Sequence, residues 1–140
     1  MRFTEAEINY LTSQRFGRLA TAQRNGTLQN SPVGFRYNAE HDTIDIRGRG
    51  MLTSQKYRNA TAGGPVAFVV DDIVPGQPPQ IRCVEIRGTG EAIPPPGGVD
   101  ETGGRGVDGA IIRVHPTRII SFGLSGSDDP FVHGANSRNV

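Results

Sequence analysis

The sequence predicts a mainly β protein that closes six to seven short strands into a barrel, with two or more short helices. The chain has 140 residues, which is enough for one hydrophobic core. Its 19 Gly and 10 Pro are spread along the chain and favour short elements joined by tight turns. Six or seven strands exceed the ~5–6 of a typical open sheet, and a small chain hides its strand edges most simply by closing the sheet.

The composition limits the kinds of partner. Fifteen Lys and Arg against fourteen Asp and Glu give a net charge of +1, so no overall field attracts nucleic acid or an anionic membrane, and any anion site must be local. The single Cys83 cannot form an intrachain disulfide, and its position in an apolar run favours a packed thiol. The N-terminus resembles neither a signal peptide nor a membrane span. We therefore expect a cytoplasmic protein without a membrane or nucleic-acid partner.

The N-terminal third predicts a helix followed by a hairpin. Thr4 and Glu7 form a capping box in which each side chain bonds the other residue's amide, so a helix starts here and ends between Gln14 and Gly17. Two strand-like runs, 18–22 and 28–37, flank Asn25-Gly26, a pair that favours a type I′ turn. The helix supplies a small apolar stripe that covers one side of the core.

Two further strands enclose a glycine-rich connection and a second helix. Residues 43–47 alternate, which places Ile44 and Ile46 on a buried face and Asp45 on the opposite one. Gly48-Arg49-Gly50 breaks this strand, and 51–62 predicts a helix stopped by the next two glycines. Residues 66–70 are continuously apolar, as in a central strand covered on both faces, and Asp71-Asp72 is expected to end that strand.

The last part predicts three strands, a long loop and a tail. After a turn at 75–80, residues 81–91 place Val84 and Ile86 inward and Glu85 and Arg87 outward. The Pro- and Gly-rich segment 94–109 predicts a mobile surface loop. Two strands, 110–114 and 119–122, are expected on either side of a hinge at 115–117. We expect one cofactor-binding domain over 1–124 and a C-terminal tail over 125–140.

The sequence offers little catalytic machinery of its own. His41, His115 and His133 lie far apart without metal-binding spacing, so no metal site is expected. Asp71 and Asp72 are adjacent in a strand and point to opposite faces, so they cannot easily share one reacting atom. His115, before a proline, could cap a strand or line a pocket.

The segment 47–58 is the most informative. It contains four cations and two hydroxyl side chains where a strand ends and a helix begins, with Thr53 or Ser54 as the cap. Helix amides, Lys56 and the arginines could hold phosphate oxygens. The alternative is a solvated basic helix, since basic runs are common.

The order of the motifs adds a family resemblance. Gly17-Arg18-Leu19-Ala20-Thr21, the Asn-Gly hairpin, Ser31-Pro32-Val33-Gly34-Phe35, the 43–47 strand, Ser54-Gln55-Lys56-Tyr57 and Pro65-Val66-Ala67-Phe68 follow one another along the chain. This succession, from Phe3 to Phe122, resembles the pyridoxamine 5′-phosphate oxidase-like flavin-binding split barrels. Within them it looks most like the small enzymes that use the deazaflavin coenzyme F420.

The resemblance implies a homodimer with two cofactor sites at the interface. It assigns Ser54 and Lys56 to the cofactor phosphate, and places Arg47, Gly48, Arg49 and Tyr57 close by. Ser31, Pro32 and Val33 match the strand segment along which the ring system lies. An edge-strand bend would explain Pro32 equally well without a cofactor.

The resemblance also implies an oxidoreductase that passes hydride between F420 and an organic substrate such as an enone or quinone-like compound. The length of the basic stretch favours F420 over FMN, because its oligoglutamate tail carries several carboxylates that would use Arg49, Arg58 or Lys56. The cofactor carries the hydride, so no protein nucleophile is needed, although Tyr57 or His115 could donate a proton. One alternative is an FMN-dependent oxidase or flavin reductase of the same fold. Another is a non-catalytic module: a deazaflavin or flavin carrier, a haem-handling split barrel or a small oligonucleotide-binding barrel.

Overall fold

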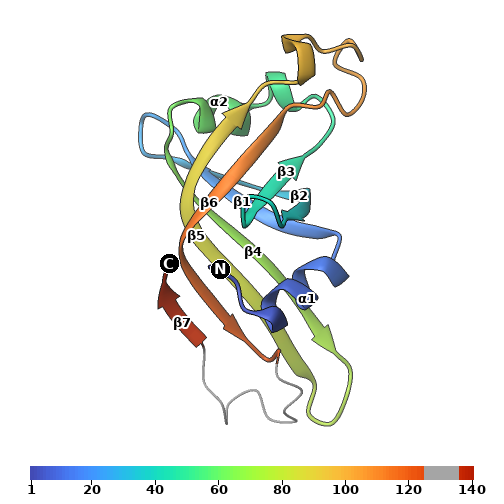
Figure 1. Cartoon of the computed structure of the whole chain (residues 1–140), viewed down its shortest axis with the longest axis vertical. Coiled ribbons are helices and arrows are strands. Elements are labelled where there is room, and N and C mark those ends of the chain that lie inside the picture. The colour runs from blue at the N-terminus through green and yellow to red at the C-terminus, as the bar shows by residue number, and fades with distance from the viewer. Residues whose placement is uncertain (125–135) are drawn as a thin grey trace.

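The computed structural model describes residues 1–124 and 136–140 (Figure 1). Two α-helices, α1 (Glu5–Ser13) and α2 (Gln55–Thr61), accompany two short 3₁₀ helices, η1 (Met51–Thr53) and η2 (Pro96–Gly98). The strands are β1 (Phe16–Ala22), β2 (Leu28–Asn38), β3 (Thr43–Arg47), β4 (Pro65–Val74), β5 (Gln80–Ile93), β6 (Ile111–Phe122) and β7 (Asn136–Asn139). Within this part of the chain, neither helix has the length and apolar character needed to cross a membrane.

The strands form one antiparallel sheet in the order β3-β2-β1-β4-β5-β6-β7. A further pairing of β3 with β6, which sets Ile46 opposite Ile112, closes the first six strands into a barrel. β7 lies outside this closure and pairs with the later half of β6. The predicted mainly β barrel with six to seven strands and two short helices is confirmed.

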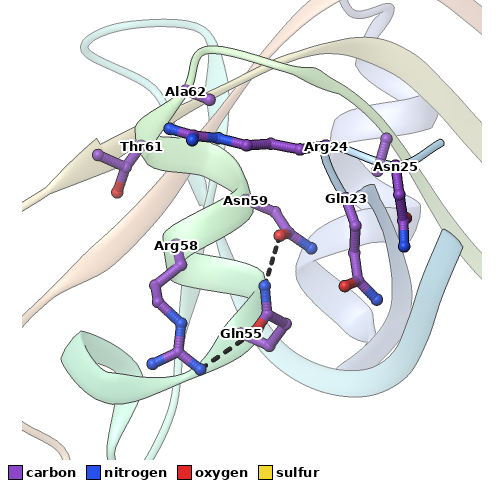
Figure 2. Close-up of a pocket in the computed structure, with 9 residues that line it drawn as sticks. Gln23, Arg24, Asn25, Gln55, Arg58, Asn59, Thr61 and Ala62 are labelled. Carbon is purple, nitrogen blue, oxygen red and sulfur yellow. Dashed lines mark hydrogen bonds between the residues drawn. The ribbon is translucent and has the colours of Figure 1, made fainter. Parts of the chain in front are cut away.

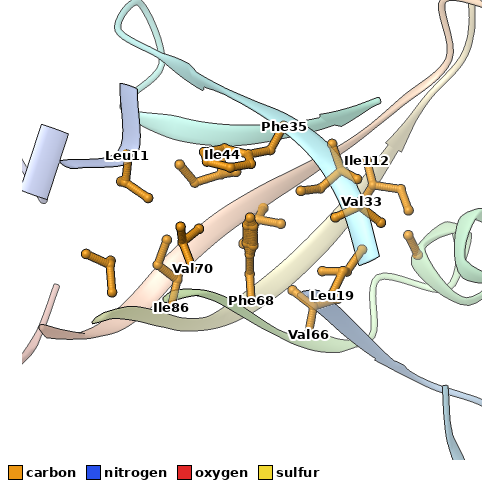
Figure 3. Close-up of a cluster of buried hydrophobic side chains, with 14 of the residues drawn as sticks. Leu11, Leu19, Val33, Phe35, Ile44, Val66, Phe68, Val70, Ile86 and Ile112 are labelled. Atoms are coloured by element: carbon orange, nitrogen blue, oxygen red, sulfur yellow. The ribbon is translucent and has the colours of Figure 1, made fainter. Parts of the chain in front are cut away.

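The core fills the inside of the barrel (Figure 3). Phe68 of β4 and Phe35 of β2 meet edge to face with ring centroids 5.1 Å apart, a favoured aromatic geometry. Leu11 of α1 packs into this core, and Tyr57 and Ala60 of α2 belong to the same cluster. Figure 1 shows the two helices toward opposite ends of the barrel, so each covers one end.

The predicted start of α1 is confirmed, but half of its capping box is wrong. The Thr4 hydroxyl accepts from the Glu7 amide at 3.2 Å. The Glu7 carboxylate does not return to Thr4. It is completely buried and accepts from the Arg138 guanidinium of β7 at 2.7 and 3.0 Å. The tertiary ion pair takes the carboxylate away from the local partner that the sequence pattern predicted.

The β1–β2 hairpin is confirmed, but its turn is not type I′. Only Gly26, at φ +85°, has a positive φ in this turn; Asn25 does not. The Gly26 amide donates to the Gln23 carbonyl oxygen at 2.9 Å, and the Gln23 amide donates to the Thr27 carbonyl oxygen. This is the three-residue hairpin loop in which a glycine after an ordinary turn restores the strand direction.

β3 buries both of its faces. Ile44 and Ile46 are fully buried as predicted, yet Asp45 on the opposite face is only 4% exposed. Its carboxylate accepts from Arg113 of β6 at 3.0 and 3.2 Å and from the side-chain NH₂ of Asn38 at 2.9 Å. These hydrogen bonds let a charged side chain occupy a buried position, because they replace those it would make with water.

β4 runs four residues past its apolar stretch, so Asp71 and Asp72 do not end it. Asp71 pairs with Arg18 of β1 at 2.9 Å, and Asp72 pairs with Arg82 of β5. The expectation that the two carboxylates point to opposite faces holds. The apolar stretch is fully covered on one face only, because Ala67 and Val69 stay partly exposed on the outside of the barrel.

β5 and β6 form a long hairpin with a bulge. Val84 and Ile86 point inward as predicted, and the Cys83 thiol is packed, where burial raises its pKa to about 11. The two strands predicted at 110–114 and 119–122 are one continuous strand, so the expected hinge is wrong. The register shifts next to Gly88, which pairs with Pro116, and this bulge accommodates a proline that cannot donate to the ladder.

Contacts with the rest of the fold hold the end of the 94–109 loop and residues 136–139 in place. Asp108 is buried and accepts from the Leu52 amide at 2.8 Å and the Ala110 amide at 3.0 Å. Of the predicted tail, residues 136–139 form β7, and 125–135 lie outside the described residues. Through the bond from Leu52 to Asp108, the 94–109 loop contacts the segment predicted to bind phosphate.

Candidate functional site

The segment between β3 and α2 is built by local turn chemistry. The predicted single helix over 51–62 divides into η1 and α2, and Ser54 caps α2 by accepting from the Tyr57 amide at 3.2 Å. The Ser54 hydroxyl also donates to the Met51 carbonyl oxygen at 2.7 Å. Because α2 has only seven residues, its dipole is short, and cationic side chains must provide most of the attraction for an anion.

The loop before β6 supports this segment. The Gly50 amide donates to the Gly106 carbonyl oxygen at 3.1 Å, and Arg49 forms an isolated bridge with Val107. With the Asp108 contact to Leu52, three contacts hold the 49–52 backbone against 106–108. The connection is positioned by a part of the chain that the sequence had indicated only as a surface loop.

The cations of the 47–58 segment lack the carboxylate partners that most arginines have elsewhere in the described chain. Six other arginines each lie within ion-pair distance of a carboxylate: Arg18, Arg36, Arg82, Arg87, Arg113 and Arg138. Within residues 1–124 and 136–140, Arg47, Arg49 and Lys56 have no acidic partner. Arg58 donates only to neutral oxygens, those of the Thr53 carbonyl and the Gln55 side chain. The segment thus holds a local excess of positive charge.

The predicted ring-binding segment lies on β2 where that strand has one free edge. β3 pairs only with residues 34–38 of β2, so residues 28–33 pair with β1 alone in the described part of the chain. Ser31 and Val33 point toward the barrel interior, and Pro32 lies on the exposed outer face. The Ser31 hydroxyl oxygen is buried without a hydrogen-bond partner. An unsatisfied buried hydroxyl beside a free strand edge is the kind of group that a ligand completes.

Arg47 lies between the predicted phosphate-binding segment and the predicted ring-binding segment, but its side chain lines a separate cavity. It lies opposite Gly34 of β2, three residues beyond Ser31. With Arg15 and Arg36 it lines a cavity of about 540 Å³ between the end of α1 and β2. Lys56, Arg49 and Ser54 do not line this cavity. The structure therefore brings Ser54 and Lys56 together on α2, and places Arg47 toward the β2 segment.

The two candidate proton donors, Tyr57 and His115, differ in their surroundings. Tyr57 is 8% exposed and packs in the core, and burial followed by the charge of Asp108 raises its pKa. His115 lies at the rim of another cavity and contacts Glu91, with its Nε2 2.8 Å from the carboxylate. His133 lies outside the described residues. No group of three metal-binding side chains occurs among the residues that the structure describes.

Sequence reasoning missed a groove between the β1–β2 turn and α2, which we call the amide groove (Figure 2). It measures about 610 Å³, and its polar lining consists mainly of amide and guanidinium side chains: Gln23, Arg24, Asn25, Gln55, Arg58 and Asn59. The Gln55 side chain donates to the Asn59 side-chain oxygen at 2.8 Å, and Asn59 donates to Thr21 of β1 at 3.0 Å. No sequence motif predicts this groove, because the groove is formed by turn residues and by a helix about thirty positions later in the chain.

The six-strand closed barrel, with a short helix after β3 and a free β2 edge, is a split β-barrel, the fold of the flavin-binding and pyridoxamine 5′-phosphate oxidase-like proteins that it resembles. Its fold is similar to a FAD-binding protein from Mycobacterium smegmatis, with a TM-score of 0.61 at 21% identity over 85% of this chain and 93% of that one. A putative pyridoxamine 5′-phosphate oxidase from Corynebacterium glutamicum gives 0.56 at 19% identity, over 85% and 88%. No family model matches the chain.

A curated relative is much more similar in sequence. It is a 5a,11a-dehydrotetracycline/5a,11a-dehydrooxytetracycline reductase from Streptomyces rimosus, 42% identical over 137 residues, which cover 95% of this chain and 92% of the relative. The chain belongs to the same family of split-barrel oxidoreductases as this reductase. The resemblance inferred from the order of motifs is thereby confirmed at the level of the family.

Proposed function

We propose that this protein is a reductase that uses F420 to reduce a polycyclic enone. The observation that carries the proposal is the set of unpaired cations in the 47–58 segment, next to the free edge of β2. The alternative is a solvated basic face, but six arginines elsewhere in the described chain lie within ion-pair distance of a carboxylate, whereas Arg47, Arg49 and Lys56 do not. Unpaired cations at a glycine-rich connection instead favour an anionic ligand. The coarser part of the proposal, a flavin-type cofactor, also fits the FAD-binding protein of similar fold.

The residues present fit such a cofactor. Lys56 and Arg49 would hold the phosphate, and Ser54 could accept one further hydrogen bond beyond its cap. Ser31, with its unpartnered hydroxyl, and Pro32 and Val33 would contact the ring system along β2. When bound, reduced F420 supplies the hydride, and the chain's own side chains bind, orient and exclude water.

The substrate class rests on the family. The Streptomyces relative is named for the reduction of dehydrogenated tetracyclines, which are polycyclic compounds. At 42% identity over nearly the whole of both chains, we propose the same general class here: a fused-ring enone whose carbon–carbon double bond accepts hydride. Loss of reduced-F420 absorbance after anaerobic mixing with 5a,11a-dehydrotetracycline would support this class. No reaction with any polycyclic enone or quinone would instead favour a carrier.

Lys56→Ala is expected to weaken F420 binding about 10- to 100-fold, because it removes a hydrogen bond to a charged group worth about 1.5–3 kcal/mol. Titration calorimetry measures the change. Arg2→Ala removes the same charge near the N-terminus, where the side chain bonds only the backbone carbonyl oxygens of His41 and Asp42, and should leave affinity unchanged. Equal losses in both variants would contradict a direct contact.

Lys56 also allows a test without mutation, because it is the only lysine in the chain. A lysine-directed acylating reagent should therefore modify one internal position, detected by mass spectrometry of peptides. Saturating F420 should protect this position, and FMN should protect it less. Preferential binding and protection by FMN would overturn the F420 assignment in favour of the FMN-dependent alternative.

We further propose that a second copy of the chain covers the outer face of β1, β4, β5 and β6. Ala67 and Val69 are only partly exposed on this face, Ile73 and Ile81 are 64% and 44% exposed, and Cys83 lies among them. On this face Arg18 pairs with Asp71 and Arg87 pairs with Glu85, which limits the repulsion between two copies. The apolar outer face explains why the β4 sequence reads as a strand covered on both faces.

Val69→Glu is expected to convert the dimer into a monomer, because it would bury an unpaired charge at the centre of this face. Sedimentation velocity gives the oligomeric state. Pro32 pairs with Arg18 on the same face, so the cofactor should also bind less tightly to the variant. A wild-type monomer that binds cofactor would contradict an interface site.

A further inference from the structure

Asp108 is a buried carboxylate without a cationic partner in the described chain. It is 6% exposed. The other two carboxylates that are buried among the described residues, those of Glu7 and Asp45, each accept from a guanidinium group. Asp108 instead accepts from two main-chain amides, that of Leu52 at 2.8 Å and that of Ala110 at 3.0 Å, one on each oxygen. Burying a carboxylate without a cation is a costly way to stabilise a fold, so this one indicates a further role.

The two amides that Asp108 binds lie at distant places in the chain. The bond from Ala110 is local, and Gly109 between the two residues has a φ of +84°, a conformation that glycine adopts readily. The bond from Leu52 spans 56 positions and reaches the middle of η1. The local bond fixes the Asp108 side chain at the start of β6, and the distant bond makes it an anchor for the segment between β3 and α2.

The anchored residue, Leu52, lies between the two cations proposed to hold the cofactor phosphate. It follows Arg49 by three residues and precedes Lys56 by four. The Ser54 cap, which starts α2, comes directly between Leu52 and Lys56. The backbone at Arg49 is also bridged to Val107 of the loop before β6. Both cations are therefore carried by backbone that this loop holds in place.

Asp108 holds this backbone without neutralising its cations. Each carboxylate oxygen accepts from an amide, and neither Arg49 nor Lys56 forms an ion pair with it. The carboxylate nevertheless adds a negative charge near the segment: burial, followed by this charge, raises the pKa of the Tyr57 hydroxyl. A nearby negative charge by itself repels an anionic ligand. The charge of Asp108 and its hold on the backbone therefore have opposite effects on the affinity for an anion.

We propose that Asp108 is a positioning residue for the cofactor phosphate, which acts through the Leu52 amide and fixes the backbone of Arg49 and Lys56. This inference rests on the proposed function. Asp108 itself does not touch the cofactor. Its hold on the backbone outweighs the repulsion from its charge, because cations carried by a loose connection would lose more conformational freedom when the cofactor binds.

Asp108→Asn separates the two effects, because it removes the negative charge and leaves one acceptor oxygen for two amides. Titration calorimetry with F420 and with FMN, which both carry a phosphate, should show about ten-fold weaker binding to the variant. Loss of the charge alone would strengthen binding. Asp100→Asn is the matched control, because it removes a carboxylate that accepts only from Thr102 and Gly104 of the same loop. It should not weaken binding.

Three further measurements show whether Asp108 acts through the cationic segment. In a double-mutant cycle, Asp108→Asn should cost less affinity in the Lys56→Ala background, where the cation being positioned is already absent. In turnover with reduced F420, Asp108→Asn should raise KM and leave kcat unchanged. Amide hydrogen exchange of the cofactor-free protein should be faster at 50–56. Asp108→Ser, whose single oxygen can keep only the local bond from Ala110, should give the same result.

The outcomes distinguish this inference from the proposed function. If the wild type binds FMN and not F420, the F420 assignment fails, and weaker FMN binding to Asp108→Asn still supports the positioning role. If Asp108→Asn binds F420 as tightly as the wild type or more tightly, the positioning role is wrong and the F420 assignment stands. Additive losses in the double-mutant cycle would also overturn the role, because Asp108 would then act apart from Lys56. If the wild type binds neither cofactor, both proposals fail.

Discussion

Arg138→Ala is expected to destabilise the protein by about 3–5 kcal/mol, the largest effect we predict for a side chain far from the candidate site. The substitution leaves the Glu7 carboxylate, which is 0% exposed, without its guanidinium partner. Among the described residues, the Ser121 hydroxyl, at 3.4 Å, is then the neighbour left to donate to it. The same change removes the bond from Arg138 to the Arg2 carbonyl oxygen, so β7 and the N-terminal segment lose their connection together.

Chemical unfolding curves of the wild type and the variant measure this loss, which should also lower the melting temperature by about 10 °C or more. Arg118→Ala is the matched control, because Arg118 also bonds β7, through Asn139 and Ser137, but at an exposed position. It should cost less than about 1 kcal/mol. The double variant Glu7→Gln/Arg138→Met should recover much of the stability, because it removes the buried charge. A double variant as unstable as Arg138→Ala would show that packing of β7, and not the charge, matters.

Glu7 also shows why part of the fold follows from sequence and part does not. The Thr4 and Ser54 caps were predictable because each bonds an amide only three residues away. The partner of Glu7 is 131 residues away, so a local pattern assigned its carboxylate to the nearest amide instead. The same holds for Asp45, which alternation places outside the core until Arg113 of β6 buries it. Hydrogen bonds between residues close in sequence can be predicted from the sequence. Ion pairs between residues far apart in sequence form only once the barrel has closed.

The candidate site divides in the same way. The excess of cations in 47–58 could be read from the sequence, and the resemblance placed it after the third strand. Which of those cations lack an acidic partner could not be read, because the pairing depends on strand register. Arg24 was assigned only to a turn, yet that turn folds against α2 and supplies one side of the amide groove. A groove made by two segments distant in sequence has no motif of its own.

Gly88→Ala is expected to cost about 3 kcal/mol of stability, although it adds only one methyl group. A Cβ at Gly88 would lie 1.9 Å from the His115 carbonyl oxygen and 2.9 Å from its carbonyl carbon. Both atoms are backbone and cannot rotate away, so the two strands must separate at the bulge. Glycine is required here for the close approach of two backbones.

The position of this bulge gives the substitution a consequence for the whole barrel. Before it, residues 112–114 of β6 pair with β3 and close the barrel; after it, residues 118–121 pair with β7. The bulge between Arg87 and Gly88 lies where the neighbour of β6 on the side away from β5 changes from β3 to β7. A bend there lets the same strand pair with β3 in the closed barrel and with β7 outside it. Separating the strands at Gly88 should therefore loosen the β3–β6 closure and, through β3, the connection that leads into α2.

Two measurements distinguish this effect from a general intolerance of alanine. Gly64→Ala is the matched control, because a Cβ there would meet its nearest atom, the Asn59 carbonyl oxygen, at an ordinary 3.7 Å. It should change stability by less than about 1 kcal/mol. Amide hydrogen exchange should then show faster exchange in β3 for Gly88→Ala and unchanged exchange in the β1–β2 hairpin, which pairs without β6. If Gly88→Ala unfolds like the wild type, the backbone at the bulge has room to shift, and closure of the barrel does not depend on this glycine.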